Sequence, residues 1–254
     1  MKVAAIALNT FKEAVRDRIL YAILVFALVM LAGSTILVTI SVGGEVKIIK
    51  DLGLASISIF GTLIAVFLGI GLVSKEIERR TVYTIISKPI HRYQFILGKY
   101  LGLVLTLMVN VAVMALGLIG LAYVWEGIPN SRLLLAVLFI FLELMLITAL
   151  ALFFSTFSSP TLSAIFTLCL FVAGHLSADL RLFAARLGGT MVKISAESVY
   201  FLLPNLSRLN FKDQAVHGFA FDVGTTALSV SYAIFYIAML VLAAMAIFQR
   251  RDFR

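Results

Sequence analysis

The sequence predicts an all-α membrane protein, a polytopic bundle of six transmembrane helices. Hydrophobic residues make up 62% of the 254 residues and charged residues 13%, with a mean hydropathy of +1.08. A soluble domain is near half apolar and about a quarter charged, and one globule of this length cannot bury so much apolar surface. The apolar residues also form six runs, and each is near the roughly 20 helical residues that cross about 30 Å of hydrocarbon. Lipid must therefore cover the outside of the fold.

The first eighteen residues precede the first run and have the period of a helix. Its apolar face carries Val3, Ala7, Phe11 and Ala14. Its polar face carries Asn9, Lys12, Glu13 and Arg16, and Asp17 follows before the first span. A short basic amphipathic helix of this kind lies in the membrane interface. It either only anchors the chain or also contacts a cytoplasmic partner, through Lys12, Glu13, Arg16 and Asp17.

The predicted spans are 21–40, 56–73, 100–124, 133–154, 161–176 and 226–248. The fifth is the shortest because His175 and Asp179 end its apolar run, so we expect it to be tilted or to bend back. The second span contains Gly61, Gly69 and Gly71. Small residues allow helices to approach closely, which predicts either a dimer seam or tight packing within the chain.

Basic residues are divided unequally between the two sides of the bundle. Short segments on one side carry thirteen, against three on the other, and the longer loop 177–222 adds five to the poorer side. The positive-inside rule therefore predicts that both termini are cytoplasmic. We expect the membrane to be a bacterial inner (plasma) membrane. The net charge of +8 fits anionic lipid headgroups rather than nucleic acid, because no soluble basic domain is present.

The stretch 75–99 is a charged loop between the second and third spans, with six basic residues. Thr81 can cap a short helix over 82–87. Pro89 ends that helix and can begin the next one. Such a helix–break–helix is either a solvated connector or a rigid surface held by a partner protein, and we favour the second. The candidate contact residues are Glu76, Glu78, Arg79, Arg80, Thr81, Val82, Tyr83, Thr84, Ile85, Ile86, Ser87, Lys88, Pro89 and Arg92.

Glu143 lies near the middle of the fourth span. A carboxylate at that depth is costly unless it is paired or protonated, so it should face the interior of the bundle or of a dimer. It is either a residue of the transport path or a neutral acid bonded to a neighbouring helix, for example to Asn110 or Thr106 of the third span.

Signals for catalysis and for metal binding are missing from the sequence. No G-x-x-x-x-G-K-[ST] run occurs, and this run forms the phosphate-binding loop of many ATPases. We therefore expect no ATP hydrolysis by this chain and no cofactor bound to it. His91, His175 and His217 are far apart in the sequence and are interpreted as polar boundary residues rather than metal ligands. The single cysteine, Cys169, lies in an apolar run and excludes a disulfide framework.

Several short motifs follow one another in a recognisable order. They are 11–18 (FKEAVRDR), Glu76, Arg79, Thr81, 87–92 (SKPIHR), 97–102 (LGKYLG), 152–155 (LFFS), 203–206 (LPNL) and 250–253 (RRDF). By these motifs the chain resembles the permease subunits of type-2 ABC exporters. The resemblance covers essentially the whole length, as one transmembrane permease domain over 1–254.

The resemblance implies a division of labour between subunits. The permease pairs with a second copy, and a separate ABC ATPase dimer binds ATP and Mg below it. The helix within 1–18 and the coupling loop 75–99 contact the ATPase, and 177–221 folds as short re-entrant helices at the outer face. The alternative is a secondary transporter or channel without a motor, which would require internal repeats or several intramembrane charges. The cargo is not identified by the sequence.

Overall fold

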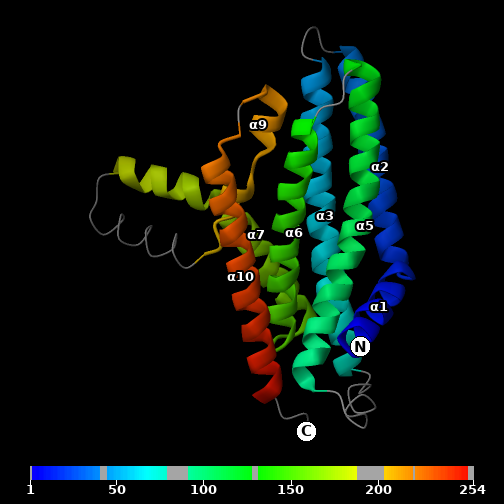
Figure 1. The fold of residues 1–254 in the computed structure, drawn as a ribbon, viewed down its shortest axis with the longest axis vertical. Helices are drawn as coiled ribbons and strands as arrows, with labels where there is room; N and C mark the ends of the chain where they lie inside the picture. The colour runs from blue at the N-terminus through cyan, green and yellow to red at the C-terminus, as the bar shows by residue number, and fades with distance from the viewer. Residues whose placement is uncertain are drawn as a thin grey trace.

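The computed structural model of the chain is a bundle of long helices (Figure 1). It describes residues 2–40, 45–78, 91–127, 131–187, 203–219 and 221–250. Within these residues six helices are long and apolar enough to cross a membrane, and no strand occurs. The elements are α1 (Lys2–Val15), α2 (Arg18–Ile40), α3 (Glu45–Glu78), α5 (Arg92–Glu126), α6 (Ser131–Ser155), α7 (Pro160–Leu187), the 3₁₀ helix η1 (Leu206–Leu209), α9 (Lys212–His217) and α10 (Val223–Arg250).

All six predicted spans are confirmed as helices, and so is the helix at the N-terminus. The helices extend beyond the apolar runs, because a charged residue is compatible with helical backbone once the helix has left the hydrocarbon. The apolar part of α7 ends at Ser177, close to the predicted end. The helix itself does not stop there, and Figure 1 shows its last part projecting sideways from the bundle.

The start of α5 corrects one prediction. Pro89 is not the first residue of this helix, since α5 begins at Arg92. His91 precedes it in an extended conformation, and its backbone N–H donates to Gln94 Oε1 over 3.4 Å. The side chain of Gln94 thus satisfies a backbone donor at the helix start.

The helix α3 is central and packs against α2, α5 and α6. A Cβ atom placed on Gly69 would lie 2.9 Å from the Ala151 Cβ of α6, and one on Gly61 would meet the Leu144 side chain of the same helix. Two of the three glycines singled out in the sequence therefore serve packing within the chain. A Cβ on Gly71 would meet nothing within 4 Å.

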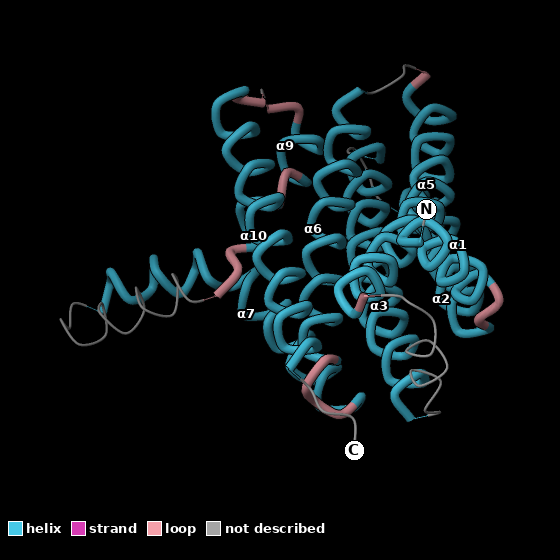
Figure 2. The backbone as a smooth tube through the Cα atoms, turned by 60° about the horizontal axis from the view of Figure 1, so that its bottom comes forward, coloured by secondary structure: helices cyan, strands magenta, loops and turns pink. Residues whose placement is uncertain are grey.

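Both chain termini lie at the same end of the bundle (Figure 1). We call this the inner end, because the sequence predicts it to be cytoplasmic, and the opposite end the outer end. Figure 2 brings the inner end forward and shows α1 lying obliquely across the bundle rather than along it. The short elements η1 and α9 belong to the part of the chain between α7 and α10, and α9 lies at the outer end (Figure 1).

An ion pair joins α3 and α5 near the outer end. Lys50 Nζ lies 2.8 Å from both carboxyl oxygens of Glu126, and the Lys50 side chain is only 6% exposed. We expect Glu126→Gln to lower the free energy of unfolding by about 1–3 kcal/mol, because the buried ammonium loses its charged partner. Thermal unfolding of the purified protein in one detergent measures this loss.

Removing both charges is the control for this pair. Lys50→Met combined with Glu126→Gln should be more stable than Glu126→Gln alone, since no uncompensated charge then remains buried. A double variant as unstable as the single one would contradict this account of the contact.

Candidate functional site

Most of the predicted contact loop lies outside the described residues. The part of the loop outside the described residues is 79–90. It includes Arg79, Arg80, the predicted helix over 82–87, Lys88 and Pro89. Glu76 and Glu78 belong to the last turn of α3, and their side chains are likewise not described. The described part of the candidate site consists of the elements that flank this loop and of a cluster around Glu143.

The N-terminal helix packs directly on the start of α5. A Cβ atom on Gly98 would lie 2.7 Å from Ile6 Cβ, and one on Gly102 would lie 2.6 Å from the Ala7 carbonyl oxygen. Two glycines four residues apart share one helix face, which lets another helix approach closely. Thr10 and Ala14 of α1 are fully buried. The apolar face predicted for this helix therefore packs against protein, and the LGKYLG motif supplies the contact surface.

Lys99 is buried beside this contact, although it belongs to the charged stretch 75–99. It is 1% exposed, and its Nζ lies 3.5 Å from Glu13 Oε2 and 5.8 Å from the centroid of the Phe95 ring. Glu13 is thus engaged within the chain by an ion pair between α1 and α5. Lys12 and Arg16 are exposed, so these two predicted contact residues lie on the open surface of α1.

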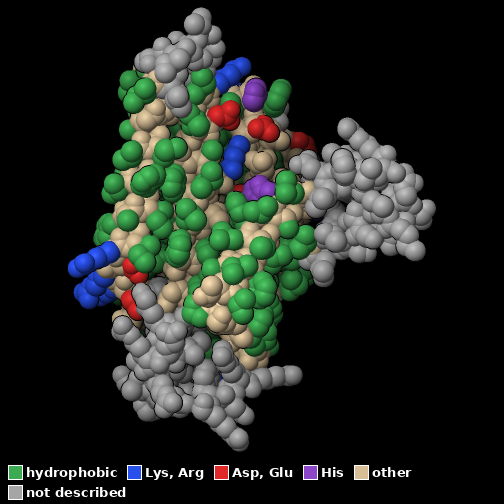
Figure 3. Space-filling view, turned by 180° about the vertical axis from the view of Figure 1, so that it is seen from behind, with side chains coloured by type: hydrophobic (Ala, Val, Ile, Leu, Met, Phe, Trp, Pro, Cys, Tyr) green, Lys and Arg blue, Asp and Glu red, His purple; other side chains and the backbone are tan. Residues whose placement is uncertain are grey.

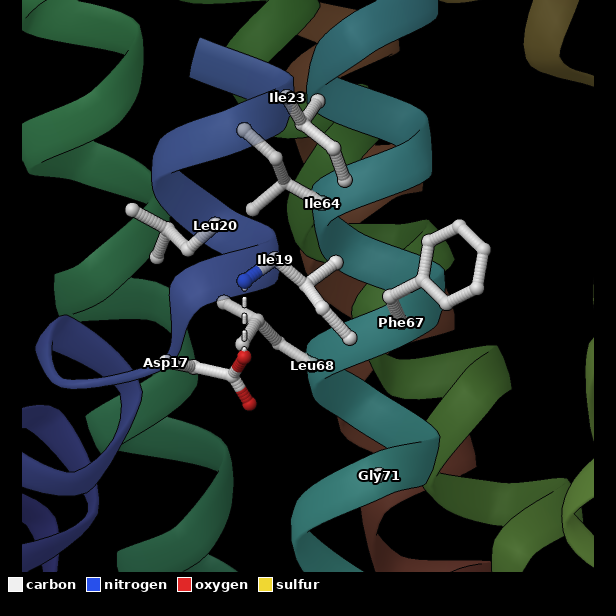
Figure 4. Close-up of a pocket in the computed structure, with 8 residues that line it drawn as sticks. All are labelled: Asp17, Ile19, Leu20, Ile23, Ile64, Phe67, Leu68 and Gly71. Atoms are coloured by element: carbon white, nitrogen blue, oxygen red, sulfur yellow. Dashed lines mark hydrogen bonds between the residues drawn. The ribbon is translucent and has the colours of Figure 1, made fainter. Parts of the chain in front are cut away.

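Asp17 connects α1 to α2. Its Oδ1 accepts a hydrogen bond from the Ile19 backbone N–H over 3.0 Å, the dashed line in Figure 4, which is the geometry of a helix N-cap. The residue also lines a hollow of about 140 Å³ between α2 and α3. The other lining residues are Ile19, Leu20, Ile23, Ile64, Phe67, Leu68 and Gly71. Asp17 therefore has a structural role at the start of the first span.

Arg92 binds the end of α10. Its Nη1 donates to the backbone oxygens of Gln249 over 3.1 Å and of Phe248 over 3.5 Å. The rings of Phe95 and Phe248 stack beside it, with centroids 5.6 Å apart. The last carbonyls of a helix lack partners inside the helix, and a cation is favourable there. The structure shows that Arg92 holds α10 to α5. Its role as a contact for a partner protein stays a prediction.

Glu143 is fully buried, and its neighbour is not the predicted one. The Nδ2 of Asn110 donates to the Thr106 carbonyl over 2.8 Å, and the Thr106 hydroxyl donates to the Gly102 carbonyl over 2.9 Å. Both side chains are thus used within their own helix, as short polar side chains often are. Glu143 Oε1 lies instead 3.3 Å from Nε2 of His175 on α7. The interpretation of His175 as a boundary residue was therefore incomplete.

Lys212 is the third titratable group of this cluster, and sequence reasoning missed it. It is the first residue of α9, which packs against α3 and α6. Burial lowers the pKa of Lys212, and the nearby carboxylates of Glu143 and Asp213 oppose that change. In the sequence Lys212 is only one of several basic residues in a long loop, so no local pattern assigns it to the interior.

The chain segment around Lys212 is held to three helices. The Ser207 hydroxyl donates to the His175 carbonyl of α7 over 2.7 Å, and the Ser229 hydroxyl of α10 donates to the Arg208 carbonyl over 2.9 Å. From α6, Arg132 Nη1 donates to the Gly218 carbonyl over 2.7 Å. Figure 3 shows acidic, basic and histidine side chains together near the upper end of a largely hydrophobic face, and a separate group of basic and acidic side chains at its lower left edge. Of the predicted region 177–221, the described residues 203–219 contain the short helices η1 and α9, and re-entry into the membrane stays a prediction.

Within the described residues, no group of three or more His, Cys, Asp or Glu side chains is arranged to hold a metal ion. Cys169 is exposed on α7. The arrangement as a whole consists of membrane helices, an N-terminal helix packed across one end, and a buried polar cluster.

The comparison with known families agrees with this architecture. A family model described as ABC-2 family transporter protein matches residues 4–253. A comparison with curated proteins gives no match. Proteins of this family are membrane components of transport systems and are not themselves the catalytic part. Since the match covers nearly the whole chain, and the chain has six helices able to cross a membrane, this protein belongs to the ABC-2 transporter family.

Proposed function

We propose that this protein is the permease subunit of an ATP-driven exporter and that it is coupled to a separate ABC ATPase. Family membership supports a permease subunit of an ABC transporter. One structural observation favours coupling through the inner end. The start of α5, which directly follows the loop, contacts α1 through Gly98 and Gly102 and the end of α10 through Arg92.

This arrangement suggests how force would reach the bundle. The partner dimer binds ATP and Mg and closes, and it holds the loop between Glu78 of α3 and Arg92 of α5 together with Lys12 and Arg16 of α1. A displacement of the loop moves the start of α5, which carries α1 and the end of α10 with it. A partner shifts such an equilibrium only by binding the two conformations with different affinity, so its contacts with the loop must differ between nucleotide states.

The proposal includes the assembly and its orientation. The permease pairs with a second copy in a bacterial inner membrane, with both termini in the cytoplasm. The excess of basic residues on one side of the bundle supports this orientation, and both termini lie at one end. Exposed apolar side chains such as Val25, Leu116 and Phe235 leave surfaces of α2, α5 and α10 for lipid or for the second copy.

Co-purification tests the proposal. An ABC ATPase encoded beside this chain should purify with it, and the reconstituted pair should hydrolyse ATP faster than the ATPase alone. Transport by the reconstituted permease without any ATPase would contradict the proposal and favour the motor-independent alternative. Labelling of a cysteine introduced within 75–99 only from the outer face of intact cells would also contradict it.

A further inference from the structure

We propose that Glu143 and His175 form a proton-binding pair inside the bundle, and that Lys212 becomes the partner of Glu143 when the proton leaves. The inference is independent of the proposed function, because it concerns only contacts within this chain. It starts from the tautomer of His175. The Nδ1 atom of His175 lies 3.2 Å from the Phe171 carbonyl oxygen, and a carbonyl oxygen only accepts hydrogen bonds. The hydrogen of the neutral ring therefore sits on Nδ1.

The other ring nitrogen then faces Glu143 with a lone pair. His175 Nε2 lies 3.3 Å from Glu143 Oε1, and an ionised carboxylate also presents only lone pairs. One further proton, on either atom, turns this contact between two acceptors into a favourable one. Within the described residues, neither Glu143 oxygen has a hydrogen bond of standard geometry, so the carboxyl group depends on this contact. The His175 side chain is 24% exposed whereas Glu143 is fully buried, so a proton can reach the pair from the surface of the chain through His175.

Other charged groups around the pair are few in the described part of the chain. On α9, Lys212 interacts electrostatically with both Glu143 and His175, and Asp213 interacts electrostatically with Lys212. Three cations on the neighbouring elements have contacts elsewhere. Lys50 of α3 pairs with Glu126 of α5, Arg208 of η1 lies over the Tyr232 ring of α10, and Arg132 of α6 binds the Gly218 carbonyl.

The protonation state of the pair therefore determines whether Glu143 is held to His175 of α7 or attracts Lys212 of α9. With the proton bound, the carboxyl group shares it with His175 of α7, and Lys212 has little attraction to it. When the proton is released to water, His175 is neutral and the Glu143 carboxylate attracts the Lys212 ammonium, which holds α9 against α6. Acidification should consequently loosen α9, and alkaline conditions should hold it in place.

Chemical labelling of a reporter on α9 tests this. Ala215 is 1% exposed on the packed face of α9, and Phe219, just after α9, is 61% exposed. Each is changed to cysteine in a Cys169→Ser background of the full chain in detergent, and the labelling rates with a charged maleimide are compared. Dividing one rate by the other removes the change of thiol reactivity with pH that both cysteines share. We expect the labelling rate of Ala215→Cys, divided by that of Phe219→Cys, to rise at least about tenfold from pH 8 to pH 5.5. Loss of a charged contact makes a local opening of α9 more favourable by about this factor.

Three further variants distinguish the proton pair from a general loosening of the fold by acid. Glu143→Gln carries no charge at any pH, so the ratio should be high and independent of pH, and Lys212→Gln should give the same result by removing the other charge. His217→Gln is the matched control, because His217 Nδ1 also lies 3.2 Å from the carbonyl oxygen four residues earlier while its ring is exposed on α9. It should keep the pH profile of the parent. A flat ratio in the parent, or a pH dependence that persists in Glu143→Gln and Lys212→Gln, would overturn the proposal.

Discussion

Reversing Arg79 and Arg80 to Glu is expected to abolish the ATP hydrolysis that the permease stimulates in its partner. Under the proposed function these residues contact the ATPase just beyond the inner end of α3, which ends at Glu78. Reversal replaces attraction by repulsion, and disruption of a buried charged contact at an interface costs enough to weaken binding more than about tenfold. The measurement is the rate of ATP hydrolysis by the reconstituted pair, together with the fraction of ATPase retained on the purified permease.

Lys47→Glu is the matched control for this reversal. Lys47 is an exposed cation in the first turn of the same helix, at the outer end. It should leave both the stimulated rate and the retained fraction unchanged. If the Arg79 and Arg80 reversal behaves like Lys47→Glu, the loop is not the contact surface for the ATPase.

Gly102→Leu is expected to separate α1 from α5. Even the first carbon of the new side chain would lie 2.6 Å from the Ala7 carbonyl oxygen and 2.6 Å from Thr10 Cβ. A backbone atom cannot move aside as a flexible side chain can, so α1 has to leave its position. Overpacking of this kind costs about 1–3 kcal/mol, and the Lys99–Glu13 ion pair is disturbed as well. Thermal unfolding in detergent measures the loss of stability, and hydrogen exchange measures the loosening of α1.

Gly120→Leu makes the same chemical change on the same helix in open space. A Cβ atom there meets nothing within 4 Å. The unfolding temperature of this control should stay near that of the unsubstituted protein, and exchange in α1 should not change. Equal effects at both positions would show that loss of glycine from α5, rather than contact with α1, determines the stability.

The spans could be predicted from the sequence because the length of an apolar run is a direct physical requirement of the bilayer. The residues at which the helices end could not be predicted in this way. The helix α3 continues past its apolar run to Glu45 and Glu78, since hydration of charged side chains outside the hydrocarbon does not break helical backbone. A local preference of proline predicts a start of α5 at Pro89, whereas the extended His91 defines the start at Arg92.

The partners of individual charges depend on tertiary packing that no local pattern encodes. The sequence suggests Asn110 and Thr106 as partners for Glu143. The side chain of each instead donates a hydrogen bond to a carbonyl oxygen one turn earlier in its own helix. The neighbour that the structure shows, His175, comes from α7, and Lys212, whose ammonium interacts electrostatically with Glu143, comes from α9. A usable signal did exist for the contact between α1 and α5. Gly98 and Gly102 have the spacing of a close helix contact, although their motif supported only the family resemblance when the sequence was considered alone.

The position of α1 has a consequence for how the protein is made. Glu13 and Lys99 are 86 residues apart in the chain, so α1 leaves the ribosome long before its docking surface on α5 exists. Synthesis proceeds from the N-terminus, and until then the apolar face of α1 needs a temporary cover, which the lipid headgroup region provides for an amphipathic helix. The end of α10 can reach Arg92 only after α10 itself has been synthesised. Under the proposed function, the inner end is therefore ready for the ATPase only after α10 has docked on Arg92.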